Sequence, residues 1–246
     1  MSLLKHISTN SPCLAVLVDP DKATGHAFND LIELLSSPLA DLILVGGSTL
    51  MSPNMEVVID KIRSKSEIPI VLFPGTSYQL SPKADGILFL SLISGRNPEY
   101  LITRQVESAP LIRNMGLESI ATGYILVGND QKSAVSYVSQ TQPIPFDQTN
   151  IIVATAIAGE MLGLQCIYLE AGSGAEQSIS PETIASVKKN ISIPLIVGGG
   201  IDSESTCEMI IEAGADMVVV GSALEKDPKL LIDLAILFKN FQTSHA

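Results

Sequence analysis

Short apolar runs, each bounded by Gly, Pro or Asp, alternate along the chain with amphipathic stretches of helical length. Runs this short and continuous are typical of strands buried on both faces of a parallel sheet. Eight such runs in 246 residues, with no linker between them, favour a closed (β/α)8 barrel, for which about 250 residues is typical. We therefore predict one α/β domain, a TIM barrel over residues 1–246, with an open doubly wound sheet as the alternative. The runs are LAVLV from Leu14, LILV from Leu42, IVLF from Ile70, GILFL from Gly86, ATGYILV from Ala121, CIYLE from Cys166, PLIVGGG from Pro194 and MVVVG from Met217.

One βα unit of this array is irregular. Only residues 74–83, PGTSYQLSPK, separate the third run from the fourth, and two prolines make this segment unsuited to a crossover helix. We expect the third helix to be missing or reduced to a turn. A polar segment over residues 139–150 is expected to form a surface loop before the helix that leads to the sixth strand.

Three runs share a lead-in, because Ala40-Asp41, Ala84-Asp85 and Ala215-Asp216 each stand just before a strand. The pair places a small packing residue next to a turn former. The recurrence of the same Ala-Asp pair before several strands is typical of a repeated βα array.

Composition limits both the core and the ligands. Hydrophobic residues make up 46% of the sequence while Trp is absent, so Val, Ile, Leu and Ala must build the core. The net charge of −11 and the pI near 4.6 argue against a nucleic-acid or anionic-membrane surface, since both require an excess of Lys and Arg. A phosphorylated ligand would therefore be held mainly by backbone amides.

Cysteine usage and the N-terminus bear on the compartment. Cys13, Cys166 and Cys207 lie in apolar segments without zinc-ligand spacing, which predicts reduced, buried thiols in a cytoplasm. The N-terminus lacks a signal-peptide pattern, and no window holds about 18 uninterrupted apolar residues. We expect a cytoplasmic protein with at most peripheral membrane contact.

Glycines follow the last two runs, at Gly198-Gly199-Gly200 and at Gly221-Ser222. Active sites of such barrels lie at the carboxyl ends of the strands, and the loops after strands seven and eight are the usual phosphate site. Glycine lets the backbone approach an anion closely. Tight turns alone are the alternative explanation. Neither stretch has the G-x-G-x-x-G spacing of a dinucleotide site.

Acidic residues follow the first run. Asp19 and Asp21 could bind Mg²⁺, which prefers carboxylate oxygens and also holds substrate phosphates, and Ser48 could add a hydroxyl from the second strand end. The alternatives are an Asp-Pro turn in which Asp21 caps the next helix, and a Gly-Gly-Ser helix cap.

Glu170 ends the otherwise apolar sixth run and precedes a glycine-rich loop. A carboxylate is costly to bury, so this position favours a functional role, such as accepting a proton from a substrate hydroxyl. Tyr124 and Tyr168 could orient the same substrate or serve only in packing. The histidines are expected at the surface, and the absence of a Ser-His-Asp signature or nucleophile elbow disfavours hydrolase chemistry.

Five segments together resemble a known family. VDPDK, LVGGST, YLEAGSGA, IVGGGI and VVVGSA, in this order, are similar to motifs of the geranylgeranylglyceryl phosphate synthases and the related bacterial prenylglyceryl phosphate synthases. The similarity extends from about Leu14 to about Leu224, and YLEAGSGA is its most specific element. The resemblance implies Mg²⁺-dependent transfer of a geranylgeranyl group from its diphosphate to the sn-3 hydroxyl of sn-glycerol 1-phosphate, with release of diphosphate. It also fits the irregular unit, because barrels of this family lack a normal third helix.

The resemblance assigns roles to individual residues. Asp19 and Ser48 match its magnesium positions, and Glu170 would take the proton of the acceptor hydroxyl. Tyr124, near the end of the fifth run, is a second catalytic candidate that the resemblance does not assign. The metal would neutralise the diphosphate and help the allylic C–O bond ionise. The positions that match the glycerol-phosphate site are Tyr168, Leu169, Glu170, Ala171, Gly172, Ser173, Gly174, Gly199, Gly200, Gly221 and Ser222.

Two departures from the family pattern matter. Leu17 stands where some bacterial members carry a phosphate-facing lysine, so that contact must be absent or come from elsewhere. The sequence after Glu170 resembles one branch of the family, whose members transfer geranylgeranyl groups and are multimeric. This resemblance implies a C20 donor and a homo-oligomer, either a dimer or a hexamer.

Two other functions remain as alternatives. A sugar-phosphate isomerase or lyase would use the same phosphate loops but would need a second acid or base facing Glu170. A catalytically silent barrel could bind phosphorylated metabolites through the glycine loops alone. The joint presence of Asp19, Ser48 and Glu170 speaks against the silent barrel, which needs neither metal nor base.

Overall fold

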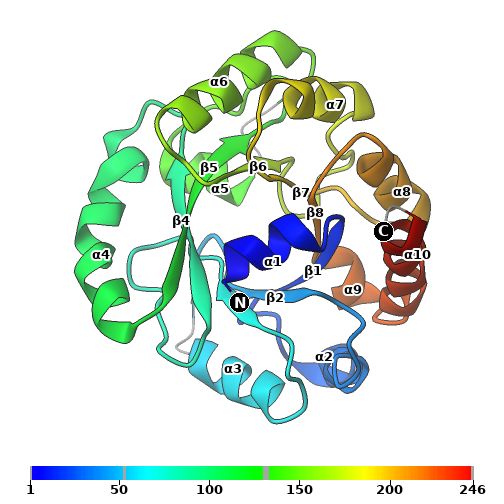
Figure 1. The fold of residues 1–246 in the computed structure, drawn as a ribbon. Helices are drawn as coiled ribbons and strands as arrows, with labels where there is room; N and C mark the ends of the chain where they lie inside the picture. The colour runs from blue at the N-terminus through cyan, green and yellow to red at the C-terminus, as the bar shows by residue number, and fades with distance from the viewer. Residues whose placement is uncertain (1, 52–53, 130–132, 245–246) are drawn as a thin grey trace.

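The computed structural model describes residues 2–51, 54–129 and 133–244. Within these residues, eight strands pair side by side in sequence order, all parallel, and the last closes onto the first (Figure 1). The predicted (β/α)8 barrel is confirmed. The strands are β1 (Cys13–Val18), β2 (Leu42–Val45), β3 (Ile70–Leu72), β4 (Gly86–Leu92), β5 (Glu118–Leu126), β6 (Cys166–Glu170), β7 (Leu195–Gly198) and β8 (Met217–Val220).

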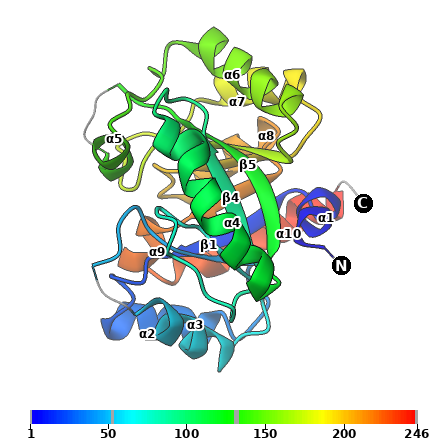
Figure 2. The same cartoon turned by 90° about the vertical axis from the view of Figure 1, so that its left-hand side faces the viewer.

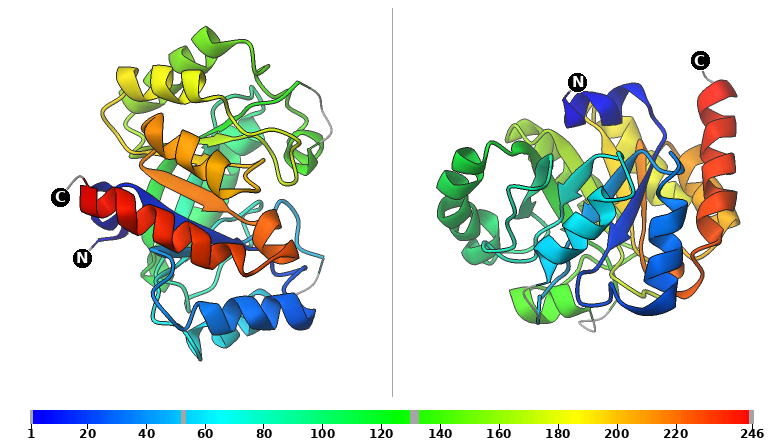
Figure 3. Two further views of the ribbon diagram at one scale, coloured as in Figure 1. Left: turned by 90° about the vertical axis from the view of Figure 1, so that its right-hand side faces the viewer. Right: turned by 90° about the horizontal axis from the view of Figure 1, so that it is seen from below.

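Helices surround the barrel, and Figure 2 shows α4 lying across the outer side of β4. Helix α1 and the C-terminal end of α10 lie on the side of the barrel opposite α5 (Figure 3). A π-helical turn, η1 (Glu99–Thr103), leads into α4. The helices are α1 (Leu3–Thr9), α2 (Gly25–Leu34), α3 (Met55–Arg63), α4 (Arg104–Met115), α5 (Ala134–Ser139), α6 (Thr149–Met161), α7 (Pro181–Asn190), α8 (Glu204–Glu212), α9 (Ser222–Lys226) and α10 (Leu230–Ser244).

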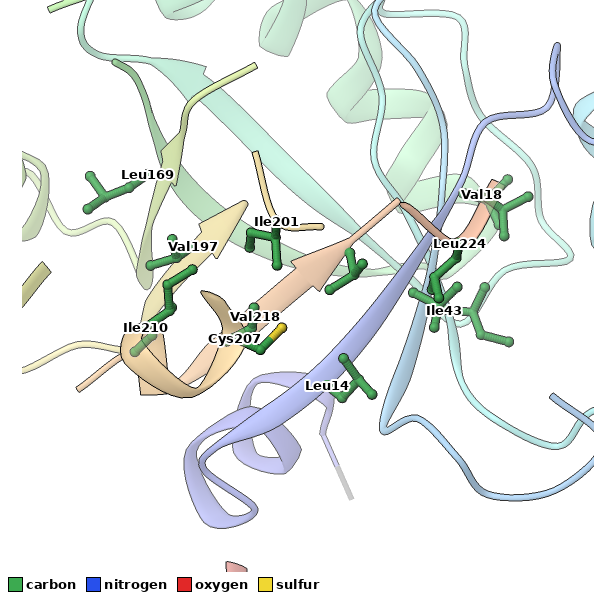
Figure 4. Packing of buried hydrophobic residues seen from close by; sticks show 14 of the residues in the cluster. Leu14, Val18, Ile43, Leu169, Val197, Ile201, Cys207, Ile210, Val218 and Leu224 are labelled. Atoms are coloured by element: carbon green, nitrogen blue, oxygen red, sulfur yellow. The ribbon is translucent and has the colours of Figure 1, made fainter. Parts of the chain in front are cut away.

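The core has two layers, because successive side chains of a strand point to opposite faces. Side chains such as Ala15, Leu44 and Ile196 fill the barrel interior. Their neighbours pack outward against the helices, as Figure 4 shows for Val197 and Val218. The three cysteines are free and buried in these two layers, as predicted.

The segment after β3 contains no helix. Residues 73–85 run from the end of β3 to the start of β4 as turns and bends, which confirms the predicted absence of the third helix. The segment over residues 139–150 is a mostly exposed or half-buried connection between α5 and α6, as predicted for a surface loop, except that Ser139, Thr141 and Ile144 are buried. Of these three, Ile144 forms a bridge with Val127 and so extends the sheet beyond the end of β5.

The Ala-Asp lead-ins satisfy backbone donors at the amino end of the barrel. Asp41 accepts a hydrogen bond from the Leu14 amide at 2.8 Å, and Asp85 accepts one from the Ile70 amide at 2.7 Å. In each case the carboxylate before one strand binds the start of the preceding strand. The acidic residue of the pair is therefore a structural device at the end of the barrel opposite the predicted site.

Candidate active site

The carboxyl ends of the strands meet around one cavity of about 600 Å³. Asp19 after β1, Ser48 after β2 and Glu170 at the end of β6 all line it. Glycines after β7 and β8 complete the lining. The strand ends that the sequence analysis selected therefore form one site.

The loop after β7 requires glycine. Gly199 and Gly200 have φ angles of +84° and +66°, which side chains rarely adopt. A Cβ atom on Gly200 would lie 2.3 Å from the carbonyl oxygen of Gln177. Beside this loop, the hydroxyl oxygens of Ser173 and Ser222 are 3.2 Å apart and join the loops after β6 and β8. These loops line the cavity at the usual phosphate position of a barrel, where backbone amides and hydroxyls can bind an anion.

Glu170 is buried at the mouth of the barrel, with 6% of its surface exposed. Its Oε1 accepts a hydrogen bond of 2.7 Å from the Gly172 amide. Burial raises the pKa of Glu170 to about 7, against the opposing effect of that hydrogen bond. Near neutral pH the carboxyl can therefore both accept and release a proton.

Three aromatic rings of the cavity lining pack against one another, and Glu170 interacts with the two tyrosines among them. Phe73 stacks on Tyr168 with ring centroids 5.2 Å apart, and the centroids of Tyr124 and Tyr168 are 5.4 Å apart. Burial, with a contribution from the Glu170 charge, raises the pKa of both tyrosines well above the usual value, so both phenols stay protonated. The Tyr168 hydroxyl is buried close to Glu170, yet it makes no hydrogen bond of good geometry to any residue that the structure describes. A ligand oxygen would satisfy this donor.

The loops after β1 and β2 surround Asp19. Its Oδ1 accepts a hydrogen bond from the Asp21 amide at 3.1 Å, and the ammonium group of Lys22 lies 3.6 Å from its Oδ2. The Asp21 carboxylate accepts a hydrogen bond from the Met51 amide at 2.7 Å. Since the N-cap of α2 is Thr24, the interpretation of Asp21 as a helix cap is wrong. Asp21 instead joins the loops after β1 and β2.

Comparison with known proteins decides the family. Residues 9–237 match the PcrB family. The chain belongs to the PcrB family.

Relatives in this family share most of their length with the chain. A geranylgeranylglyceryl phosphate synthase of Spirosoma linguale is 46% identical over 230 residues, 94% of this chain and 92% of the relative. The synthase of Methanopyrus kandleri is 40% identical over 240 residues, 98% of this chain and all of the relative. The crystal structure of (S)-3-O-geranylgeranylglyceryl phosphate synthase from Thermoplasma acidophilum, in complex with sn-glycerol-1-phosphate, has a TM-score of 0.89 and 30% identity, covering 98% of this chain and 99% of that one. The resemblance inferred from five motifs is confirmed, and with it the prediction of an enzyme of this family.

Most of the residues predicted for the PcrB-family site line the cavity. Leu169, Ala171 and Gly172 do not. Tyr168 and Glu170 point into the barrel, so Leu169 between them must point outward, and Figure 4 shows it in the outer layer of the core. We therefore expect no side-chain contact between Leu169 and a ligand. Those that line the cavity are Asp19, Ser48, Tyr124, Tyr168, Glu170, Ser173, Gly174, Gly199, Gly200, Gly221 and Ser222.

The cavity also has lining residues that sequence reasoning missed. Phe73 stands directly after β3, and inspection of that strand end would have found it. Arg104 lines the cavity with its guanidinium 5.5 Å from the ring centroid of Tyr100. Its position depends on η1, for which the sequence carries no local signal. Leu17, the departure from the family pattern, lines the cavity as well.

His6 and His26, the two histidines in the described residues, do not line the cavity. His26 is exposed and His6 is half-buried beside Asn10, so only His26 lies at the surface as predicted. His245 lies outside the described residues.

A divalent metal fits the chemistry of the Asp19 side of the cavity. Among the described residues, no three His, Cys, Asp or Glu side chains gather as a metal cluster. The Asp19 carboxylate and the Ser48 hydroxyl both line the cavity and offer hard oxygen donors. Such a sparse set suits an ion that takes its other ligands from water and substrate phosphates.

One further finding concerns membranes. No helix in residues 2–51, 54–129 and 133–244 is long and apolar enough to cross a bilayer.

Proposed function

We propose that this barrel is a geranylgeranylglyceryl phosphate synthase that joins a prenyl group to sn-glycerol 1-phosphate. The observation that carries the proposal is the cavity in which Tyr168, Glu170 and the glycine loops of β6 to β8 converge. Its fold matches, over 98% of the chain, that of the Thermoplasma acidophilum enzyme in complex with sn-glycerol-1-phosphate.

The acceptor would occupy the β6–β8 side of the cavity. Amides of the Gly199-Gly200 and Gly221-Ser222 loops would hold its phosphate without a cationic side chain. The buried Tyr168 hydroxyl, close to Glu170, would donate a hydrogen bond to a glycerol oxygen. Glu170, held by the Gly172 amide, would then accept the proton of the reacting hydroxyl.

The prenyl chain would occupy the apolar side of the cavity, along β4. Ile87 and Phe89 belong to the outer layer of the core, whereas Leu88 and Leu90 belong to the inner one. Because all four line the cavity, it extends past both faces of β4. The missing helix after β3 leaves room for this extension, and Val138 of α5 adds to its apolar wall.

The diphosphate would lie on the β1–β2 side. Asp19 and Ser48 would hold Mg²⁺, and Lys22, which lies 3.2 Å from Glu225 and 3.6 Å from Asp19, would supply the cationic contact that Leu17 cannot make. When bound, the metal would neutralise the diphosphate charge and so favour ionisation of the allylic C–O bond.

The reaction balances with the residues of this site. The allylic C–O bond breaks, and diphosphate leaves with the electron pair. The sn-3 oxygen of the acceptor forms the new C–O bond, and its proton passes to Glu170. Holding both substrates in one cavity supplies the orientation that this step requires.

The assay that tests the proposal supplies Mg²⁺, geranylgeranyl diphosphate and radiolabelled sn-glycerol 1-phosphate, with the 3-phosphate enantiomer as control. Label that enters an organic phase only from the 1-phosphate is the expected result. A donor series from C10 to C25 would then define the chain length. Saturable phosphate binding without transfer from any donor would favour the sugar-phosphate or silent-binder alternatives.

The proposal includes a homo-oligomeric state and a cytoplasmic location for this protein. Two surface regions expose apolar side chains: η1 and α4, with Ile102 and Val106, and α6, with Ile151 and Met161. Such exposure favours a homo-oligomer, either a dimer or a hexamer. Light scattering would measure the mass of the assembly. The three free, buried thiols suit a reducing cytoplasm.

A further inference from the structure

The segment that replaces the third helix buries a glutamine between two strand-end loops. Gln79 is 1% exposed, although it lies in a connection without regular structure. Its Nε2 donates a hydrogen bond of 3.1 Å to the carbonyl oxygen of Gly47, and its Oε1 accepts one of 3.1 Å from the Gly75 amide. One side chain therefore bridges the backbone of the loop after β2 to that of the loop after β3.

These two loops are in direct backbone contact. A Cβ atom on Gly75 would lie 2.5 Å from the carbonyl oxygens of both Gly47 and Ser48. A Cβ atom on Gly46 would lie 2.0 Å from the carbonyl oxygen of Phe73. Such close approach is possible because Gly46 and Gly75 have no Cβ atom, and the Gln79 amide links the two loops through its side chain.

The contact continues to Asp19. The Cβ position of Gly47 lies 3.2 Å from Oδ1 of Asp19, so the Gly47 backbone packs against the carboxylate. A shift of Gly47 would change both the surroundings of Asp19 and the position of Ser48, the next residue in the chain. Within the described residues, Gln79 is not among those that line the cavity, so it acts through its neighbours.

The segment that carries Gln79 is itself anchored to α3. Lys83 forms an ion pair with Asp60 at 2.6 Å, and Ser81 donates a hydrogen bond of 3.5 Å to Glu56. A side chain on an anchored segment can hold a loop in place, because its own position is fixed.

From this geometry we infer that Gln79 is a positioning residue for the donor half of the site. It holds Gly47 and Ser48 against Asp19, so that the diphosphate and its metal meet a preformed set of oxygen ligands. Glutamine suits this position because it supplies one donor and one acceptor to two backbone partners. The glycerol-phosphate half, built on β6 to β8, does not depend on it. The inference rests on the function proposed above.

The test separates the two halves of the site by direct binding, without turnover. Calorimetry measures the affinity for inorganic diphosphate with Mg²⁺ and, separately, for sn-glycerol 1-phosphate. Gln79→Met removes both hydrogen bonds at similar volume, and Gln79→Glu replaces the donor to Gly47 with an acceptor oxygen while it keeps the acceptor for Gly75. We expect each variant to bind diphosphate about tenfold more weakly, while the Kd for glycerol phosphate changes less than twofold. In turnover, KM for the prenyl diphosphate should rise more than kcat falls.

A matched control lies at the opposite end of the barrel. The Nε2 of Gln242 donates hydrogen bonds to the carbonyl oxygens of Asn10 and Pro12, at 3.1 and 2.9 Å. Gln242→Met also removes two bonds to backbone, and it should lower Tm without changing either Kd.

Three outcomes would contradict the inference. The positioning role would be overturned if both Gln79 variants bound diphosphate with unchanged affinity. It would also be overturned if their affinities for diphosphate and for glycerol phosphate fell by the same factor. If Gln79→Met fails to fold, Gln79→Glu, which keeps the bond from Gly75, decides alone. Failure of the unaltered protein to bind diphosphate would instead overturn the proposed function, and this role with it.

Discussion

At the scale of single residues, the carboxyl of Glu170 carries the most specific prediction. Its pKa is raised to about 7 by burial, and a base must be deprotonated before it can act. We expect kcat/KM to fall about tenfold per pH unit below this pKa and to level off above it. Glu170→Gln should keep its affinity for glycerol phosphate, and its kcat should fall about 10²- to 10⁴-fold. Its pH–rate profile should no longer bend near the pKa of Glu170. A pH–rate profile measures both, and full activity in the variant would exclude Glu170 as the base.

The same carboxyl affects stability. Its pKa in the folded state lies above the ordinary glutamate value of 4.5, so between 4.5 and about 7 the folded state binds more protons than the unfolded state. Stability is therefore lost as pH rises through this window, by on the order of 3 kcal/mol. Glu170→Gln should become more stable than the unaltered protein as pH rises from 5 to 8. Urea unfolding at several pH values measures the difference in free energy of unfolding between the two proteins. If this difference did not change with pH, burial would not raise the pKa of Glu170.

Gly200 gives a steric prediction. Its φ of +66° and the 2.3 Å approach of the Gln177 carbonyl to its Cβ position mean that Gly200→Ala must move the loop after β7. We expect the Kd for sn-glycerol 1-phosphate to rise at least tenfold, as calorimetry would measure. The control is Gly163→Ala, with φ of +87° and open space around the Cβ position, which should destabilise by about 1 kcal/mol and leave binding unchanged. Equal effects on binding would contradict a local role for Gly200.

At the scale of elements, the strands were the easiest to predict because both faces of each are buried. β2 and β6 begin and end where the apolar runs do, whereas β5 starts at Glu118, before its run. Glu118 was missed because its carboxylate is used outside the strand: it accepts hydrogen bonds from the amides of Leu3 and Leu4, at the start of α1. No local pattern reveals a bond across that distance in sequence.

The Ala-Asp lead-ins give a prediction about elements. Asp216 accepts hydrogen bonds from the Leu195 amide at 2.7 Å and the Ser11 hydroxyl at 3.2 Å, and it pairs with Lys188. Asp216→Asn should lower the free energy of unfolding by about 1–3 kcal/mol, because a charged acceptor is lost from buried donors. Its kcat/KM should stay unchanged, since the group lies at the amino end of the barrel. Urea unfolding and steady-state kinetics measure both, with exposed Asp30→Asn on α2 as control. A fall in activity without loss of stability would contradict a structural role.

At the scale of the whole molecule, the site draws on strands from all around the closed sheet. Ligand binding should therefore stabilise the barrel as one unit. At a concentration 100 times its Kd, sn-glycerol 1-phosphate should raise the free energy of unfolding by about 2.7 kcal/mol. Chemical denaturation with and without ligand measures this shift, and the 3-phosphate enantiomer should give a smaller one. If the ligand protected only the β6–β8 loops from hydrogen exchange and left the denaturant unfolding transition unchanged, the barrel would not unfold as a single unit.

The sequence by itself determined the barrel, its irregular third unit and the strand ends that line the cavity. These features follow from local rules: strand periodicity, the exclusion of proline from helices, and glycine where the backbone takes a positive φ. Only the tertiary structure decided that Leu169 points outward, that the pKa of Glu170 is raised to about 7 and that Phe73 stacks on Tyr168. It alone placed Gln79 between the loops after β2 and β3. Desolvation and contacts between distant segments depend on which groups closure of the barrel brings together, and no local stretch of sequence contains that information.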